Sequence, residues 1–484
     1  MSSGAERSFL GHPYALSTIF FTEMWERFSY YGMRALLVLF LVDAVTGGGF
    51  GLDDRTATAI YGLYTASVYI SGVPGGWVAD RLIGAQSAVL WGAIIIGTGH
   101  LLLALPGGSA HFYLGLAVIV LGTGLLKPNI GALVAGLYPE GGARRDGGFT
   151  IYYMAVNVGA FLGPLVTAWL ARTYGWPFGF LAAALGMALG VVYFAMTRSR
   201  LGATGLAPQR SRRDWSIFAV VLSGVLLLVG LVWTGVLATT PQALQGGAIY
   251  VILGLAIAYF GYMLFFAGLT GAERRRVLVL LVLFIASSVF WSGFEQAGSS
   301  LNLFAERYTD RVIGHFEIPS GWFQSLNATF IIVFAPLFSL LWVWLDRRGR
   351  DLSFPAKFVV GLLGMAVGFL VMAAASRLVA GGSFAAPYWL VFTYLFHTWG
   401  ELALSPVGMS ATTQLTPKRF VGQSMGVWFA SLALGNLLAG RIAGEFDAGN
   451  LAAMPGQYLR IFWYGAIAAL VLLLLIPLLR RMSR

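Results

Sequence analysis

Apolar stretches recur along the whole chain and are separated by short polar breaks. Each stretch has at least about 20 residues, the length that a helix needs to cross the hydrocarbon core of a bilayer. The pattern therefore predicts an all-α membrane protein with fourteen transmembrane helices. The expected spans are 15–45, 56–80, 86–106, 111–137, 148–172, 176–197, 215–238, 246–269, 277–304, 320–345, 355–378, 386–414, 420–445 and 457–479.

The first of these stretches carries ionisable residues close to its start. A charge at the centre of a membrane helix costs about 2.5–3.5 kcal/mol even on a lenient insertion scale. At about 100° per residue, the polar residues of this stretch share one sector of about 140°, and the opposite face is apolar. Such a polar stripe is typical of a helix that lines a water-filled cavity, and it indicates a protein that moves a solute across the membrane. The stripe consists of Glu23, Glu26, Arg27, Tyr30, Tyr31 and Arg34.

An internal repeat divides the chain into two halves. Asp80-Arg81 follows the second predicted span, and Asp346-Arg347 follows the second span of the later half. Duplicated halves predict two helix bundles with a central site between them. The expected organisation is a cytoplasmic N-terminus (1–13), a six-helix bundle (14–198), a cytoplasmic linker (199–214), an extra helical pair (215–270) and a second six-helix bundle (271–484).

Composition and charge support a membrane protein. The chain of 484 residues is 58% hydrophobic and 11% charged, whereas a soluble chain carries about 25% charged residues. The net charge of +11 does not indicate a nucleic-acid partner, because most basic residues lie in short runs between spans, where orientation signals belong. We therefore expect the lipid bilayer as the surroundings, no nucleic acid as a partner, and both termini in the cytoplasm.

Three further ionisable residues lie inside predicted spans: Lys127, Glu295 and Glu401. A lysine changes its protonation or its partner more readily than an arginine, so Lys127 suits a carboxylate that alternates between charged and neutral forms. A proton that binds Glu23 or Glu26 would then alter the ion pairs of this region. The alternative is that these charges form fixed ion pairs that dock helices, or, for Glu295, a carboxyl that stays neutral.

Four sequence runs together resemble one transporter family. The Asp-Arg motif after the second span looks like the major facilitator superfamily. The run EMWERFSYYG at residues 23–32 resembles the signature of the proton-dependent oligopeptide transporters (the POT family), and GTGLLKPN at 122–129 and WGELALSP at 399–406 match that family's fourth-helix and tenth-helix motifs. The run YYMAVNVGAF at 152–161 resembles the fifth-helix signature but departs from it at its end.

This resemblance implies a prokaryotic member with the major facilitator fold, two six-helix bundles and two extra helices. It implies a proton-coupled symporter that imports di- and tripeptides by alternating access, acts as a monomer in the bacterial inner membrane, and uses protons as the coupling ion without metal or cofactor. The implied proton-coupling residues are Glu23, Glu26, Arg27, Lys127 and Glu295. The expected substrate-binding residues are Tyr30, Tyr31, Arg34, Tyr69, Lys127, Asn157, Trp291, Asn327, Glu401, Ser405 and Trp428.

Some of these roles have alternatives. Asn157 and Asn327 are amides suited to a peptide backbone, but they also suit hydrogen bonds between helices. The same fold also suits another small solute, such as nitrate, a glycoside or a peptide-like drug, although Glu401 opposite Arg34 and Lys127 disfavours a simple anion. A channel and an intramembrane enzyme are rivals from other classes. The five histidines show no metal-ligand spacing, and no nucleophile with its base converges in the spans.

Overall fold

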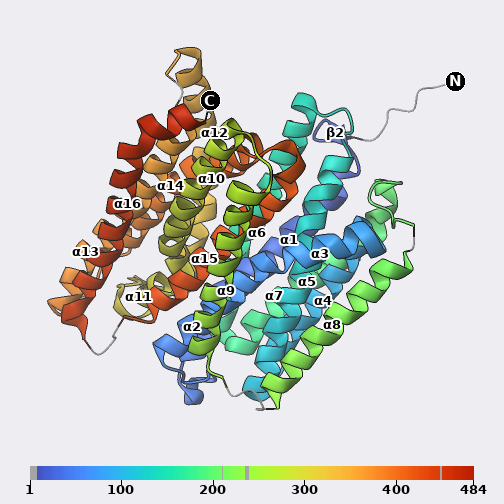
Figure 1. Cartoon of the computed structure of the whole chain (residues 1–484). Coiled ribbons are helices and arrows are strands. Elements are labelled where there is room, and N and C mark those ends of the chain that lie inside the picture. Colours follow the sequence, from blue (N-terminus) through green and yellow to red (C-terminus); the bar gives the residue numbers. More distant parts are fainter. Residues whose placement is uncertain (1–7, 210, 235–238, 351, 447–449, 484) are drawn as a thin grey trace. The chain divides into compact units, whose positions relative to one another are not determined.

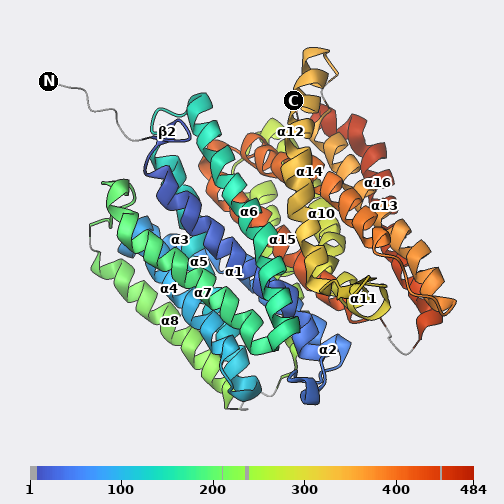
Figure 2. The ribbon, with the colours of Figure 1, turned by 180° about the vertical axis from the view of Figure 1, so that it is seen from behind.

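The computed structural model describes the chain except for residues 1–7, 210, 235–238, 351, 447–449 and 484. Parts of the predicted N-terminus and linker therefore lie outside the described residues. Over the described residues the chain is mostly helical, and its strands form two short hairpins (Figures 1 and 2). Over the described residues, every predicted span corresponds to a long helix or to consecutive helices, and the end of the span 215–238 lies outside them. The all-α membrane architecture is confirmed.

The helices group into two compact units. Unit 1 comprises Met1–Leu36 and Ile70–Thr240, and unit 2 comprises Leu37–Tyr69 and Pro241–Arg484. Residues 37–69 thus pack with the later helices, and the two extra helices belong to different units. The predicted domains are contiguous ranges of the sequence, whereas each unit joins two separate segments. The predicted boundaries stay a prediction.

In unit 1, α4 packs against both α5 and α7, and the three helices lie side by side in both views (Figures 1 and 2). Glycine brings α6 against α1, because a Cβ at Gly159 would lie 2.2 Å from the carbonyl oxygen of Met24. Small residues of this kind let helix backbones approach closely in membranes. The elements of unit 1 are β1 (Ser8–Phe9), β2 (His12–Pro13), α1 (Leu16–Val42, as far as Leu36), α3 (Gly72–Val78), η2 (Ala79–Ile83), α4 (Ala85–Ala104), α5 (Gly108–Gly136), α6 (Gly142–Tyr174), α7 (Trp176–Thr197), η3 (Arg198–Leu201) and α8 (Arg212–Trp233).

In unit 2, α13 packs against α14 and α16, and α15 packs against α10 and α9. The elements of unit 2 are the end of α1, η1 (Val45–Gly47), α2 (Asp54–Ile70), α9 (Pro241–Gly261), η4 (Tyr262–Phe266), α10 (Gly271–Phe294), η5 (Glu295–Gly298), α11 (Ser300–Tyr308), β3 (Val312–Ile313), β4 (Phe316–Glu317), η6 (Ser320–Gln324), α12 (Ser325–Arg347), α13 (Phe354–Ala380), α14 (Tyr388–Leu415), η7 (Lys418–Phe420), α15 (Val421–Ala443), η8 (Leu451–Ala453) and α16 (Met454–Met482).

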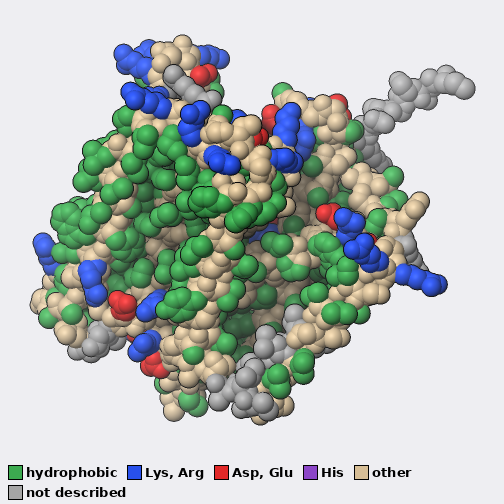
Figure 3. Space-filling view, viewed as in Figure 1, with side chains coloured by type: hydrophobic (Ala, Val, Ile, Leu, Met, Phe, Trp, Pro, Cys, Tyr) green, Lys and Arg blue, Asp and Glu red, His purple; other side chains and the backbone are tan. Residues whose placement is uncertain are grey.

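The surface of unit 2 is apolar along the middle of its helices. Leu340 of α12 is 67% exposed and Leu474 of α16 is 72% exposed, and Figure 3 shows hydrophobic side chains over this region, with Lys and Arg gathered where α12 and α16 end. Among the described residues, ten helical segments are long and apolar enough to cross a membrane. Large exposed apolar surfaces on a folded protein indicate contact with lipid or with another apolar partner.

Candidate functional site

The polar stripe of α1 is buried in unit 1. Glu23 and Glu26 are 1% and 0% exposed, and Arg27 is 4% exposed. The Nε atom of Arg27 lies 3.0 Å from Glu23 Oε1 and also contacts a carboxylate oxygen of Glu26. Three ionisable side chains therefore share one buried site, where water screens their attraction much less than it does at a protein surface.

Two other helices bring polar side chains to this ion cluster. Tyr152 on α6 makes a side-chain hydrogen bond with Glu23, and Lys127 on α5 lies within electrostatic range of Glu26. Tyr152 is two turns before Gly159 on the same face of α6, so the close approach of α6 to α1 carries Tyr152 to Glu23. The ion cluster therefore contains two carboxyl groups, on Glu23 and Glu26, and two basic side chains, Arg27 and Lys127.

The rest of the stripe continues along α1 as a band of rings and guanidinium groups. The ring centroids of Tyr30 and Tyr31 lie 5.2 Å apart in an edge-to-face arrangement. The guanidinium carbon of Arg27 lies 5.4 Å from the Tyr30 ring, and that of Arg34 lies 5.7 Å from the Tyr31 ring. Cation–π contacts at these distances hold each guanidinium beside a ring, so the predicted stripe forms one continuous surface.

Asn157 on α6 is buried, and its Nδ2 donates to the carbonyl oxygen of Tyr153, 2.9 Å away in the same helix. An amide that bonds to the preceding turn of its own helix keeps a fixed orientation. This bond leaves the second N–H and the carbonyl oxygen of the Asn157 side chain for other partners.

In unit 2, the predicted residues Asn327 and Glu401 meet directly. Asn327 on α12 donates from Nδ2 to Glu401 Oε2 at 2.8 Å and to Thr398 Oγ1 at 3.0 Å, and both acceptors are on α14. Thr398 lies one turn before Glu401, so one amide can reach both side chains. Ser405 is half-buried one turn beyond Glu401 on the same helix.

Glu295 lies at a break in the helical path of unit 2. It begins the 3₁₀ turn η5 directly after α10 and is buried. Trp291, one turn earlier, is also buried, and its indole Nε1 has no hydrogen-bond partner among the described residues. Leaving a buried indole N–H without an acceptor costs free energy. This N–H is therefore available to donate a hydrogen bond to a ligand.

The last two predicted aromatic residues lie at different depths of unit 2. Trp428 on α15 is buried, and its ring lies 6.3 Å from the Phe358 ring of α13 at an interplanar angle of 71°. Tyr69, near the end of α2, is half-buried at the edge of the apolar core. The structure therefore places Trp428 inside the packed helices of unit 2.

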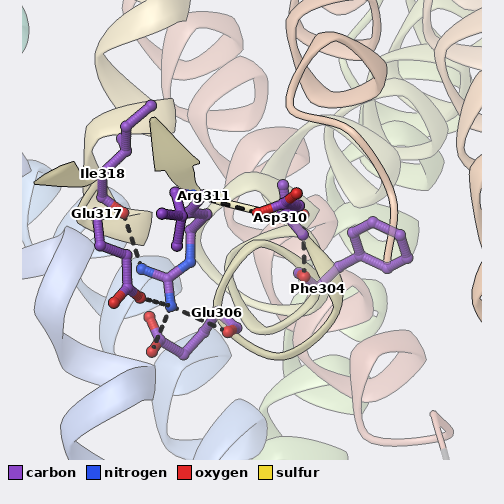
Figure 4. A network of polar contacts seen from close by, with 8 residues as sticks. Phe304, Glu306, Asp310, Arg311, Glu317 and Ile318 are labelled. Atoms are coloured by element: carbon purple, nitrogen blue, oxygen red, sulfur yellow. Dashed lines mark hydrogen bonds and ion pairs between the residues drawn. The ribbon is translucent and has the colours of Figure 1, made fainter. Parts of the chain in front are cut away.

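A second polar network lies where α11 ends, at the short hairpin β3–β4 (Figure 4). Arg311 is buried, and its Nη2 lies 2.9 Å from Glu306 Oε1 and 3.1 Å from Glu317 Oε1. Its Nη1 donates to the carbonyl oxygen of Ile318 at 2.8 Å. These contacts close the hairpin onto α11, which makes Arg311 a structural residue of this loop.

Arg307, one turn before Arg311, pairs with α2. Its Nη1 and Nη2 donate to the two carboxylate oxygens of Asp54 at 2.6 and 2.8 Å. Bidentate arginine–carboxylate pairs of this geometry are among the stronger polar contacts in proteins. This pair fastens the start of α2 to α11 within unit 2.

Sequence reasoning missed four residues of these networks. Tyr152 stands inside a motif run and Thr398 directly precedes one, but neither side chain carries a charge, so a pattern of ionisable residues does not mark them. The spacing of small residues at 159 and 163 on α6 was an available signal for Tyr152, because it predicts the close helix approach that delivers this ring. Arg307 and Arg311 lie in a polar break, where an arginine normally has a solvated surface role.

The fold and the buried charges together define a class. Long apolar helices, an apolar surface and ionisable side chains buried inside both units are the features of a polytopic membrane transporter. Residues 86–461 match the model of the POT family. The chain belongs to this family, and the predicted major facilitator fold is confirmed.

Relatives along nearly the full length support this assignment. The peptide transporter YePEPT of Yersinia enterocolitica is 43% identical over 98% of this chain and 96% of its own length. A di-/tripeptide transporter of Lactococcus lactis is 34% identical over 92% of this chain and 91% of its own. A crystal structure of the peptide transporter POT, a mutant in complex with alafosfalin, superposes with a TM-score of 0.92, at 39% identity and with 99% and 97% of the two chains covered. The class is therefore a transporter and not an enzyme.

Proposed function

We propose that this protein imports di- and tripeptides together with protons, by alternating access. The observation that carries the proposal is the buried ion cluster of unit 1, in which Glu23 and Glu26 contact Arg27 and Glu26 also lies within electrostatic range of Lys127. The cargo rests on relatives that are named as transporters of peptides and of di- and tripeptides.

The proton acts on the charge balance of the cluster. With all four side chains ionised, two negative charges balance two positive ones. A proton on Glu23 or Glu26 leaves one positive charge in excess, and in a site shielded from water this excess attracts an anionic group strongly. Proton binding and the capture of a peptide carboxylate thus favour each other, and Glu295 in unit 2 is a further proton acceptor.

The peptide is held by its two charged ends. Glu401, oriented by Asn327, accepts hydrogen bonds from the peptide ammonium group, and Arg34 and Lys127 attract its carboxylate. The indole N–H of Trp291, which has no acceptor in the part of the chain that the structure describes, donates to a peptide carbonyl group. This arrangement accepts peptides with many different side chains, because the contacts to the two charged ends do not depend on the side chains. The remaining proposed contacts are Tyr30, Tyr31, Tyr69, Asn157, Ser405 and Trp428.

The transporter works as a monomer in the bacterial inner membrane, with both termini in the cytoplasm. The basic runs between spans support this orientation, because positive charge is enriched in cytoplasmic loops. Protons serve as the coupling ion, and no resident metal or cofactor takes part.

Uptake into proteoliposomes tests the proposal. An inward proton gradient is expected to accelerate the uptake of a labelled dipeptide and to accumulate it above the outside concentration, and an uncoupler is expected to abolish the accumulation. Equal uptake with and without the gradient would exclude proton coupling. Competition with a panel of tripeptides, nitrate and a glycoside shows which solutes bind the site, and uptake of each competitor in labelled form then shows which of them are transported.

A further inference from the structure

We propose that Gly408 on α14 determines side-chain specificity, because it leaves the space that the Trp428 indole occupies. This inference rests on the proposed function, since it takes Trp428 as part of the peptide site. Gly408 touches neither proton nor substrate; it acts through the position of one ring.

The ring of Trp428 lies directly against the backbone of α14. A Cβ placed at Gly408 would lie 1.9 Å from Cη2 of Trp428, 2.5 Å from Cζ2 and 2.6 Å from Cζ3. Carbon atoms pack at about 3.5 Å or more, so even one methyl group at position 408 requires the ring to move by about 1.6 Å. Glycine is therefore the residue that keeps the ring in its observed place.

A second glycine of unit 2 shows why Gly408 controls a ring and not a helix. A Cβ at Gly435 on α15 would lie 2.4 Å from the Cβ of Trp291, 3.1 Å from its backbone carbon and 3.2 Å from the carbonyl oxygen of Ser288. Those atoms move only with α10, so Gly435 sets the distance between two helices. At Gly408 the contacts are with the far end of an indole, which rotates about its χ angles without moving a helix.

Gly408 also shares a face of α14 with the proposed ammonium site. Gly408 lies seven residues after Glu401, which is two turns along the same face and about 10.5 Å at 1.5 Å per residue. An extended peptide spans about 3.3 Å per residue, so a peptide whose ammonium group is at Glu401 directs its second or third side chain toward Trp428.

Two sides of the Trp428 ring are occupied by neighbouring helices. Phe358 of α13 packs against Trp428 within the core of unit 2, and Gly408 of α14 closes a second side. A methyl group at position 408 pushes the indole away from α14, and Phe358 resists its movement toward α13. We therefore take the displaced ring to enter the space that the second or third peptide side chain requires. Gly408 thus controls how much space is available for a bulky side chain at the second or third position of the peptide.

Transport of three dipeptides into proteoliposomes tests this assignment. For the Gly408→Ala variant, the KM of Ala-Phe is expected to rise at least about fivefold relative to that of Ala-Ala. The KM of Phe-Ala, whose bulky residue comes first, is expected to stay within about twofold of Ala-Ala. The double variant Gly408→Ala/Trp428→Phe is expected to restore the Ala-Phe ratio, because phenylalanine lacks the outer carbons that meet the added methyl group.

Gly422→Ala is the matched control. Gly422 is on the same helix as Trp428, and a Cβ there has open space around it, so its KM ratios are expected to equal those of the unmodified protein. Unchanged ratios in Gly408→Ala, or an equal loss for all three dipeptides, would overturn the assignment. If Gly408→Ala does not fold, Trp428→Phe alone is expected to lower the Ala-Phe to Ala-Ala KM ratio, and an unchanged ratio would overturn it. Absence of any dipeptide uptake by the unmodified protein would instead refute the proposed function.

Discussion

The two units hold the carboxylates of their predicted site residues in different ways. In unit 1, Glu23 and Glu26 meet the cation Arg27, and Lys127 lies within electrostatic range. In unit 2, Glu401 accepts a hydrogen bond from the neutral amide of Asn327. A proton that neutralises a carboxylate removes its attraction to a cation, whereas an amide donor responds much less to that charge. Cation pairing suits a response to protons, and amide bonding suits orientation.

The hydrogen bonds sharpen this difference. Glu26 Oε1 is buried and has no hydrogen-bond partner among the described residues. Glu401, by contrast, is half-exposed and receives a 2.8 Å bond from a side chain that Thr398 also fixes. Buried polar atoms without partners are rare in proteins and often mark a functional group. The contrast predicts that neutralising the two carboxylates affects different steps of transport.

The largest effect is expected for Glu26→Gln. The variant cannot bind a proton at position 26 and leaves Glu23 as the remaining carboxylate beside Arg27, so gradient-driven accumulation should fall at least about tenfold, which corresponds to about 1.4 kcal/mol. Exchange of labelled for unlabelled dipeptide without a gradient should persist. Accumulation and exchange are measured in the same proteoliposomes.

Glu140→Gln provides the control for this substitution, because Glu140 is exposed in the short segment between α5 and α6. It should accumulate dipeptide as the unmodified protein does. Full accumulation by Glu26→Gln would show that Glu26 is not the proton acceptor that drives accumulation.

The next effect concerns unit 2. In Glu401→Gln the ammonium group of a peptide loses its ionic partner, and the KM of a dipeptide should rise at least about tenfold, since a hydrogen bond to a charged group is worth about 1.5–3 kcal/mol. Acetylation of the peptide N-terminus should weaken uptake by the unmodified protein and have little further effect on the variant. An acetylation penalty of equal size in both proteins would place the ammonium group elsewhere.

Hydropathy and helical periodicity depend only on residues that are close together in the sequence. The sequence could therefore predict features within one helix. These two patterns placed the spans and arranged the stripe from Glu23 to Arg34 on one face. The contacts across helices depend on packing between distant segments. Nothing near Asn327 indicates that Glu401, 74 residues away, accepts its hydrogen bond. The position of Trp428 against Gly408 likewise follows from how α14 and α15 pack, which no local pattern records.

A smaller effect is expected for Tyr152→Phe, which sharpens the description of unit 1. The substitution removes one hydrogen bond to Glu23 and keeps the ring. A single bond of this kind contributes about 0.5–1.5 kcal/mol, so gradient-driven uptake should fall about threefold. Tyr153→Phe, on the neighbouring exposed side of α6, is the matched control. Equal uptake by both variants would remove Tyr152 from the proton site.

The smallest effect is expected for Asp53, a carboxylate outside the sites of Glu26 and Glu401. Asp53 precedes α2 and accepts hydrogen bonds from Thr56 Oγ1 at 2.7 Å and from the Thr56 backbone N–H at 2.9 Å. The bond from the Thr56 side chain contributes most to holding the pKa of Asp53 below its usual value. Asp53→Ala should leave transport unchanged and cost at most about 1 kcal/mol of stability, because this helix cap is solvent-exposed.

The pH dependence of this loss has a definite sign. A carboxyl group whose pKa is lower in the folded than in the unfolded state contributes stability above its unfolded pKa, and the contribution disappears as the pH falls through its folded pKa. Thermal unfolding of the purified protein should therefore show a constant deficit for Asp53→Ala at neutral pH that shrinks only below about pH 4. A deficit that instead grows on acidification would show that Asp53 stabilises α2 in its protonated form, and the capping role would be wrong.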